Sequence, residues 1–181
     1  GRDALRVKLM RWGLVPYWAK NSPGSGHINA RCETVAEKPT FRASFGNRHC
    51  LIPADGFFEW RKEAGIKQAY YIALSDGRPF AFAGLWDEST NTQGQMQKTF
   101  TIITTQANTK IKDLHHRMPV IVAPENYQTW LSGAADVESI FKSSLCAELS
   151  FYPVSPAVNQ IQFDAPACLE PYEKPQLSLG F

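Results

Sequence analysis

Three short segments of this sequence carry side chains suited to acid/base or anion-binding chemistry. They contain Asn29 with Arg31, Glu59 beside Trp60, and the run His115-His116-Arg117. An amide can orient a substrate oxygen, a guanidinium can hold a phosphate, and histidine exchanges protons near neutral pH. If the three segments meet in the folded chain, together they supply the parts of one catalytic site.

The surroundings of each segment bear on its chemistry. Asn29 and Arg31 lie two residues apart, so their side chains point the same way if the segment is extended. Glu59 ends a largely apolar run, where a carboxylate loses solvation and its pKa rises towards that of a useful general acid. His115 shortly precedes the apolar residues 120–122, and a loop that leads into a strand is a common place for catalytic groups.

Each segment taken singly also has an ordinary interpretation. An Asn close to an Arg is typical of a turn or a surface pair, and a Glu beside a Trp is typical of a solvated strand end. Adjacent histidines commonly lie on the surface or form simple hydrogen bonds. The order of several motifs along the whole chain therefore decides between these interpretations.

That order resembles the SOS-response-associated peptidase family, the abasic-site processing proteins, over nearly the entire chain. The matching stretches are Met10-Arg11-Trp12-Gly13-Leu14-Val15-Pro16-Tyr17-Trp18 and residues 28–34, 50–60, 115–119 and 152–159. Five motifs in order are more specific than any one of them. The resemblance implies an α+β fold: a single mixed domain over residues 1–181, with peripheral helices around a curved, barrel-like antiparallel sheet.

The resemblance also implies a function and a set of site residues. The function is capture of abasic sites in single-stranded DNA, as a covalent thiazolidine crosslink formed in the SOS response to DNA damage. Asn29, Glu59 and His115 match the family's catalytic residues, and Arg31 matches its phosphate-contacting arginine. Positions that line the DNA groove are matched by Trp18, Trp60 and Thr104. We expect a monomer that needs no metal or other cofactor.

The nucleophile of the family is a cysteine that becomes the first residue of the mature protein, within an opening Met-Cys-Gly-Arg. The present sequence has no such motif, and Gly1-Arg2 matches only its last two residues. We therefore expect the N-terminal segment of the domain to be missing. Thiazolidine formation needs an amine and a thiol on one terminal residue, so a polypeptide that starts at Gly1 is expected to form no more than a reducible imine.

Composition agrees with a single DNA-binding domain. The chain has 181 residues, of which 44% are hydrophobic, enough for one substantial core. Its net charge of +2 does not by itself indicate a nucleic-acid binder, so any DNA site must be a local patch. No apolar stretch is long enough to cross a membrane and no leader opens the chain, which predicts a cytoplasmic, bacterial-type protein that associates with the nucleoid when bound to DNA.

The four cysteines show no paired spacing, which indicates neither a zinc site nor a disulfide scaffold; they are Cys32, Cys50, Cys146 and Cys168. We expect all of them to be reduced. Cys32 lies close to Asn29 and is the one internal candidate for a nucleophile. It has no free amine beside its thiol, however, so its expected role is packing.

Local patterns predict the main elements. Residues 70–74 and 80–86 flank Asp76-Gly77 and predict a β-hairpin, and residues 99–105 predict a strand after a polar loop. Short buried strands are expected at 51–52 and 120–122. Helices are expected at 40–45, 108–114, 124–131 and 137–142, the last capped by Asp136. The tail from Asp164 is rich in proline and is expected to wrap the surface.

Two other functions remain open on the sequence. A peptidase that removes its own initiating methionine would use Glu59 and His115 for amide hydrolysis beside a terminal cysteine. A non-covalent single-stranded DNA-binding module would depend on Arg31 and the tryptophans but not on Glu59 and His115. The role of His116 and the preferred DNA junction are also left open.

Overall fold

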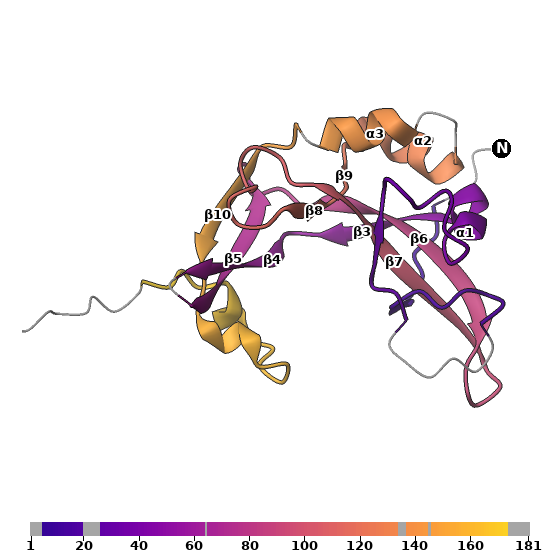
Figure 1. Cartoon of the computed structure of the whole chain (residues 1–181), viewed down its shortest axis with the longest axis horizontal. Helices are drawn as coiled ribbons and strands as arrows, with labels where there is room; N and C mark the ends of the chain where they lie inside the picture. The colour runs from indigo at the N-terminus through magenta and orange to yellow at the C-terminus, as the bar shows by residue number, and fades with distance from the viewer. Residues whose placement is uncertain (1–4, 20–25, 64, 134–136, 145, 174–181) are drawn as a thin grey trace, which may run out of the picture.

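Two β-sheets form the framework of the chain, which a computed structural model describes at residues 5–19, 26–63, 65–133, 137–144 and 146–173 (Figure 1). Within these residues the larger sheet has seven strands with the central order β1-β7-β6-β3; β2 and β8 also pair with β7, and β9 pairs with β6. Its strands are β1 (Arg11–Trp12), β2 (Asn29–Arg31), β3 (His49–Ala54), β6 (Phe80–Thr90), β7 (Met96–Gln106), β8 (Arg117–Pro119) and β9 (Ile121–Val122). The smaller sheet has the order β10-β5-β4 and consists of β4 (Phe57–Glu63), β5 (Ile66–Leu74) and β10 (Leu149–Pro153).

The hairpin of β6 and β7 is the centre of the larger sheet. The first six residues of β6, from Phe80 to Leu85, are all buried. A strand that is covered on both faces has a continuous run of apolar residues rather than an alternating pattern. This explains the apolar sequence of the first half of β6. Neighbours join it antiparallel, except β1 and β2, which run parallel to β7.

The two faces of the larger sheet are covered differently. On one face, Leu85 and Ile103 pack with Trp130 and Ile140 from the short helices α2 (Tyr127–Ser132) and α3 (Val137–Ser144). In Figure 1 these two helices lie together on one side of the molecule. On the other face, Ile102 packs with residues of the smaller sheet in a second cluster. Alternation along β7 therefore directs even-numbered side chains, such as that of Thr104, towards the face that meets the smaller sheet.

The predicted fold class is confirmed: the protein is a mixed α+β fold whose sheet is curved but does not close. The predicted hairpin of residues 70–74 and 80–86 is wrong. Both strands exist, as β5 and β6, but they belong to different sheets, and β5 pairs instead with β4 and β10. The Asp76-Gly77 turn does form, since Gly77 has φ +71° and its N–H bonds to Leu74 O at 2.9 Å. The turn thus directs the chain from one sheet to the other.

Most of the predicted helices are present. They are α1 (Arg42–Asn47), the 3-10 turn η1 (Pro124–Asn126) leading into α2, and α3, although Asp136 lies outside the described residues. The predicted helix at 108–114 is wrong, and the segment forms turns. There the Asn108 side-chain oxygen accepts hydrogen bonds from Lys110 N at 3.1 Å and Ile111 N at 3.3 Å, which offers the backbone an alternative to a helix.

The C-terminal part of the described chain follows the smaller sheet. Two 3-10 turns, η2 (Pro156–Asn159) and η3 (Pro166–Leu169), come after β10. Tyr172 N then bonds to Pro153 O at 2.9 Å, which holds the described part of the tail against the end of β10. None of the described helices has the length and apolar character required to cross a membrane.

Candidate active site

Glu59 and His115 form the centre of the candidate site. Glu59 lies on β4, opposite Tyr70 of β5, and His115 lies in the turn that leads into β8. His115 Nδ1 is 3.4 Å from Glu59 Oε1, and the two side chains are 35% and 20% exposed. Burial raises the pKa of the Glu59 carboxyl, and the nearby His115 offsets part of that rise. A carboxyl that keeps its proton above its usual pH range, next to an imidazole, is suited to general acid catalysis.

The His115 ring is held through Nδ1 by the backbone of Arg117. Nδ1 lies 3.0 Å from Arg117 O and 3.2 Å from Arg117 N. A protonated Nδ1 can donate to that carbonyl or to Glu59, and an unprotonated Nδ1 can accept from the Arg117 N–H. Both protonation states of the ring therefore have a hydrogen-bond partner, as a group that exchanges a proton during a reaction requires.

Asn29 and Arg31 lie on β2, which runs parallel to β7. Arg31 is in register with Thr104, and Asn29 is in register with Ile102. Both are exposed on either side of buried Ala30, and their register partners point to the face that meets the smaller sheet. In the described residues no hydrogen bond joins Asn29 to Glu59 or His115, so the convergence of all three on one sugar stays a prediction.

Arg117 belongs to the run that the sequence singled out beside His115, but the sequence assigned it no role of its own. Its guanidinium forms a two-pronged ion pair with Glu33, with Nη1 to Oε1 at 2.5 Å and Nη2 to Oε2 at 3.0 Å. Nη2 also donates to Thr104 O at 2.6 Å. Both residues stood inside recognised motifs, but they are 84 positions apart, and nothing in the local sequence indicates that they meet.

The tryptophans predicted to line the DNA groove, Trp18 and Trp60, keep exposed ring surface, as does Trp12. Trp60 is 37% exposed, and its Nε1 donates to Asn159 Oδ1, at the end of η2, at 2.7 Å. Trp18 is 53% exposed. Trp12, which the sequence did not mark as a site residue, is 50% exposed, lies nearly parallel to the Phe100 ring and donates to Ile28 O at 2.8 Å. Exposed rings in fixed orientations are able to stack on nucleobases.

The loop that carries Trp18 is attached to the larger sheet by Asp87. This carboxylate is almost fully buried, accepts from Tyr17 N at 3.0 Å and from Ser44 Oγ at 3.3 Å, and forms an ion pair with Arg48. Arg48 also lies over the Trp86 ring, 5.6 Å from its centroid. Asp87 thus joins the loop before Trp18 to β6 and α1.

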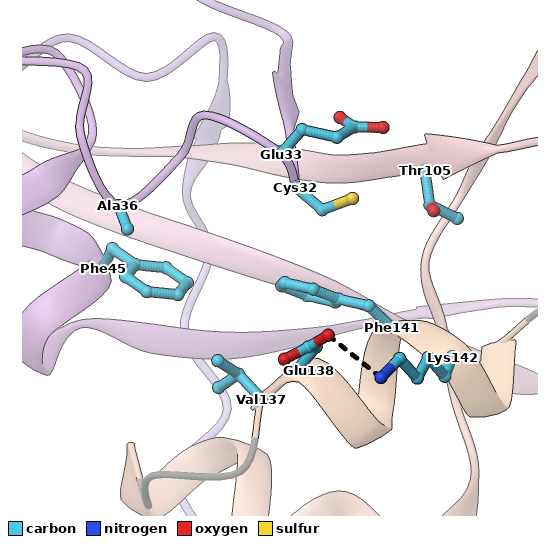
Figure 2. A pocket seen from close by; sticks show the side chains of 9 residues that line it. All are labelled: Cys32, Glu33, Ala36, Phe45, Thr105, Val137, Glu138, Phe141 and Lys142. Carbon is cyan, nitrogen blue, oxygen red and sulfur yellow. Dashed lines mark ion pairs between the residues drawn. The ribbon is translucent and has the colours of Figure 1, made fainter.

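Cys32 lies apart from the Glu59–His115 pair, on the helix-covered face of the larger sheet. Figure 2 shows it at a pocket of about 450 Å³, and the carboxylate of neighbouring Glu33 lies beside it at the same pocket, away from Phe141 and Val137. The pocket is lined by Cys32, Glu33, Ala36, Phe45, Thr105, Val137, Glu138, Phe141 and Lys142. Burial raises the pKa of the Cys32 thiol, and it raises that of Cys50 to about 12, so neither is an activated nucleophile.

No three His, Cys, Asp or Glu side chains in the described parts of the chain are arranged to hold a metal ion.

Comparison with known proteins identifies the family. Residues 1–161 match the family described as SOS response associated peptidase (SRAP). The chain is 38% identical over 171 residues to the abasic site processing protein YoqW of Bacillus subtilis, covering 91% of this chain and 76% of that protein. It is 31% identical over 174 residues to the abasic site processing protein YedK of Escherichia coli, covering 93% and 77%.

A vertebrate protein and a protein of known structure are also similar to this chain. The abasic site processing protein HMCES of Gallus gallus is 32% identical over 191 residues, which cover 91% of this chain and 57% of that protein. A crystal structure of a protein from Bacteroides thetaiotaomicron superposes with a TM-score of 0.80 at 29% identity, covering 91% of this chain and 76% of that one. The arrangement of sheets and helices is therefore shared with an experimentally determined relative.

Proposed function

This chain belongs to the SOS response associated peptidase family, and on that premise we propose that the protein captures abasic sites in single-stranded DNA as a covalent crosslink. Several of its relatives are named abasic site processing proteins. The observation that carries the proposal is the contact between His115 and the Glu59 carboxyl, whose pKa is raised by burial. This pair supports the proton transfers that aldehyde chemistry needs.

The proposed reaction begins with the ring-opened aldehyde of the abasic sugar. The amine of an N-terminal cysteine attacks the aldehyde carbon, and loss of water from the carbinolamine gives an imine. The thiol then adds to the imine carbon and its proton passes to the nitrogen, which closes a thiazolidine. Such an amine has a pKa of about 8 and such a thiol about 8.5, so both are open to activation near neutral pH.

The residues of the site are assigned roles that follow from their positions. Glu59 in its protonated form donates a proton to the sugar oxygen during ring opening and to the hydroxyl that leaves as water. His115 takes up and returns protons beside it. Asn29 orients the sugar oxygen or the attacking amine. None of these steps requires a metal or a cofactor.

Single-stranded DNA is proposed to lie along the face that bears Arg31 and Thr104 and to extend to the tryptophans. Arg31 is exposed on β2 in register with Thr104, where it is available to a phosphate. Trp18 and Trp60 offer exposed rings, and each stacked base contributes about 1–3 kcal/mol to binding. Arg31 and the rings together would form the local basic and aromatic patch that a net charge of +2 requires.

Covalent capture is tested with the protein expressed from its own start codon and a single-stranded oligonucleotide that holds one abasic site. We expect an adduct that survives heating on a denaturing gel and is absent when the aldehyde is first blocked with methoxyamine. A polypeptide starting at Gly1 is expected to give only a borohydride-reducible imine. DNA binding without an adduct would favour the non-covalent module, and cleavage of a generic peptide without an adduct would favour the peptidase.

Replacing Arg31 with alanine is expected to weaken binding of single-stranded DNA and to lower its salt dependence. One lost phosphate contact reduces the slope of log K against log salt by about 0.7. Fluorescence anisotropy at several salt concentrations measures both quantities, with Arg42→Ala, on the exposed side of α1, as the matched control. An unchanged affinity and an unchanged slope would exclude Arg31 from the DNA site.

A further inference from the structure

The ion pair between Glu33 and Arg117 connects three elements of the larger sheet. Glu33 follows β2 by two residues, Arg117 begins β8, and the guanidinium of Arg117 also bonds to Thr104 O on β7. Both prongs of the pair fall within hydrogen-bond distance, at 2.5 and 3.0 Å. The Arg117 side chain is only 15% exposed, whereas that of Glu33 is 43% exposed. Arg117 pairing in turn lowers the pKa of the Glu33 carboxyl, which keeps it charged.

The backbone of the same arginine holds the candidate catalytic histidine. Arg117 O and Arg117 N lie 3.0 and 3.2 Å from His115 Nδ1. The ring is fixed further by the neighbouring peptide groups, because Ala107 N bonds to His116 O at 3.0 Å and His115 N bonds to Ile111 O at 3.1 Å. A displacement of Arg117 would therefore move the hydrogen-bond partners of Nδ1 relative to Glu59.

From these contacts we propose that Glu33 is a positioning residue for His115, acting through Arg117. Glu33 fixes the guanidinium, the guanidinium fixes the start of β8, and the Arg117 backbone sets the orientation of the imidazole towards Glu59. This inference rests on the proposed function for its chemical meaning, since it assumes that His115 and Glu59 exchange protons during capture of the abasic sugar.

The electrostatic balance explains why Arg117 depends on Glu33. Arg117 Nε is buried without a hydrogen-bond partner among the described residues, so the guanidinium relies on its two Nη atoms. Of their acceptors, only Glu33 carries a charge. Without that charge a largely buried cation would have to find water, and the start of β8 would have to shift to allow it.

Glu33 also lies at the edge of the pocket that Cys32 lines. In Figure 2 its carboxylate lies near the Cys32 side chain and away from Phe141 and Val137, which line the other side of the pocket. The role proposed for Glu33 rests on its ion pair with Arg117 and not on any occupant of the pocket.

The test uses Glu33→Gln and Glu33→Asp in the protein expressed from its own start codon, with Glu37→Gln as the matched control. Glu37 is an exposed glutamate four residues further along the same turn segment. Three quantities are measured: the single-turnover rate of crosslinking at saturating DNA, the affinity for abasic single-stranded DNA, and the imidazole ¹⁵N shifts that report which nitrogen of His115 carries the proton.

In Glu33→Gln the crosslinking rate is expected to fall by about ten- to a hundredfold, the cost of a small misplacement of a reacting group. The His115 ¹⁵N shifts should change, and the affinity for DNA should not fall, because a negative charge has been removed. Glu33→Asp keeps the charge and should restore part of the rate, and Glu37→Gln should match wild type.

An unchanged rate and unchanged His115 shifts in Glu33→Gln would overturn the positioning role and leave the proposed function intact. A rate loss that only follows weaker DNA binding or a lower melting temperature would overturn it as well. If the wild-type protein forms no adduct, the proposed function fails, and the ¹⁵N shifts still decide whether Glu33 positions His115.

Discussion

Replacing Glu59 with glutamine is expected to slow covalent capture of abasic single-stranded DNA by about 10²–10⁴-fold, the usual contribution of a positioned general acid. Glutamine keeps the shape of the side chain but cannot donate an acidic proton to the sugar oxygen or to the leaving hydroxyl. The neighbouring His115 also loses its carboxyl partner at 3.4 Å. The affinity for DNA should change little, because Glu59 is assigned to the reaction and not to the phosphate contacts.

The rate of covalent capture should depend on pH, because Glu59 acts in its protonated form. Burial raises the pKa of Glu59, so its protonated form persists to higher pH than that of an ordinary glutamate. As the pH rises through that pKa the acid is lost, and the wild-type rate should carry a limb that falls with pH. Amine ionisation contributes a separate limb that rises with pH, near pH 8. Only the falling limb should disappear in Glu59→Gln.

The measurement is a single-turnover crosslinking time course over a range of pH, resolved on denaturing gels. Glu125→Gln, at an exposed glutamate in η1, is the matched control and should follow wild type at every pH. A Glu59→Gln protein that crosslinks at the wild-type rate would remove the acid role and favour the binding-module interpretation.

Replacing Asp87 with alanine is expected to lower the free energy of unfolding by about 2–4 kcal/mol. The change leaves Tyr17 N and Ser44 Oγ without their acceptor and removes the partner of Arg48. Asp87 itself is 1% exposed, but the Arg48 side chain is 32% exposed, so water can take over part of its solvation. The expected loss of unfolding free energy is therefore smaller than for a charge left unpaired in the core.

Thermal unfolding followed by circular dichroism measures the effect, and a drop in Tm of about 5–15 °C is expected for a chain of this length. Asp87→Asn, which keeps acceptor oxygen but loses the charge, should fall between alanine and wild type. The control is Glu138→Gln, which breaks the exposed pair with Lys142 at 3.0 Å and should cost about 0.3–0.5 kcal/mol.

Asp87 also connects stability with the proposed DNA surface, because Tyr17 precedes Trp18 in the attached loop. At a temperature where Asp87→Ala is still folded, it should bind single-stranded DNA more weakly than Glu138→Gln does. Equal Tm values for Asp87→Ala and the control would show that the buried network contributes little to the fold.

The available chemistry and most of the local structure follow from the amino-acid sequence alone. The types and order of Asn29, Glu59 and His115 within five motifs predicted the family, which the comparisons confirm. Hydrophobic pattern and turn residues predicted the strands around residues 99–105 and the helices at α2 and α3. These features are local: a strand, a turn or a cap depends on residues only a few positions apart.

Strand pairing and long-range contacts were decided by the tertiary structure. The turn at Asp76-Gly77 predicted a hairpin of β5 with β6. Instead, β5 pairs with β4 and β10, and β6 pairs with β7, β3 and β9. This arrangement buries both faces of β6, one against the helices and the other against the smaller sheet. The same packing brings Glu59 to His115 and Glu33 to Arg117 across long separations in sequence. Periodicity and turn chemistry specify which face a side chain takes, whereas only the register and stacking of the two sheets specify which other side chain it meets.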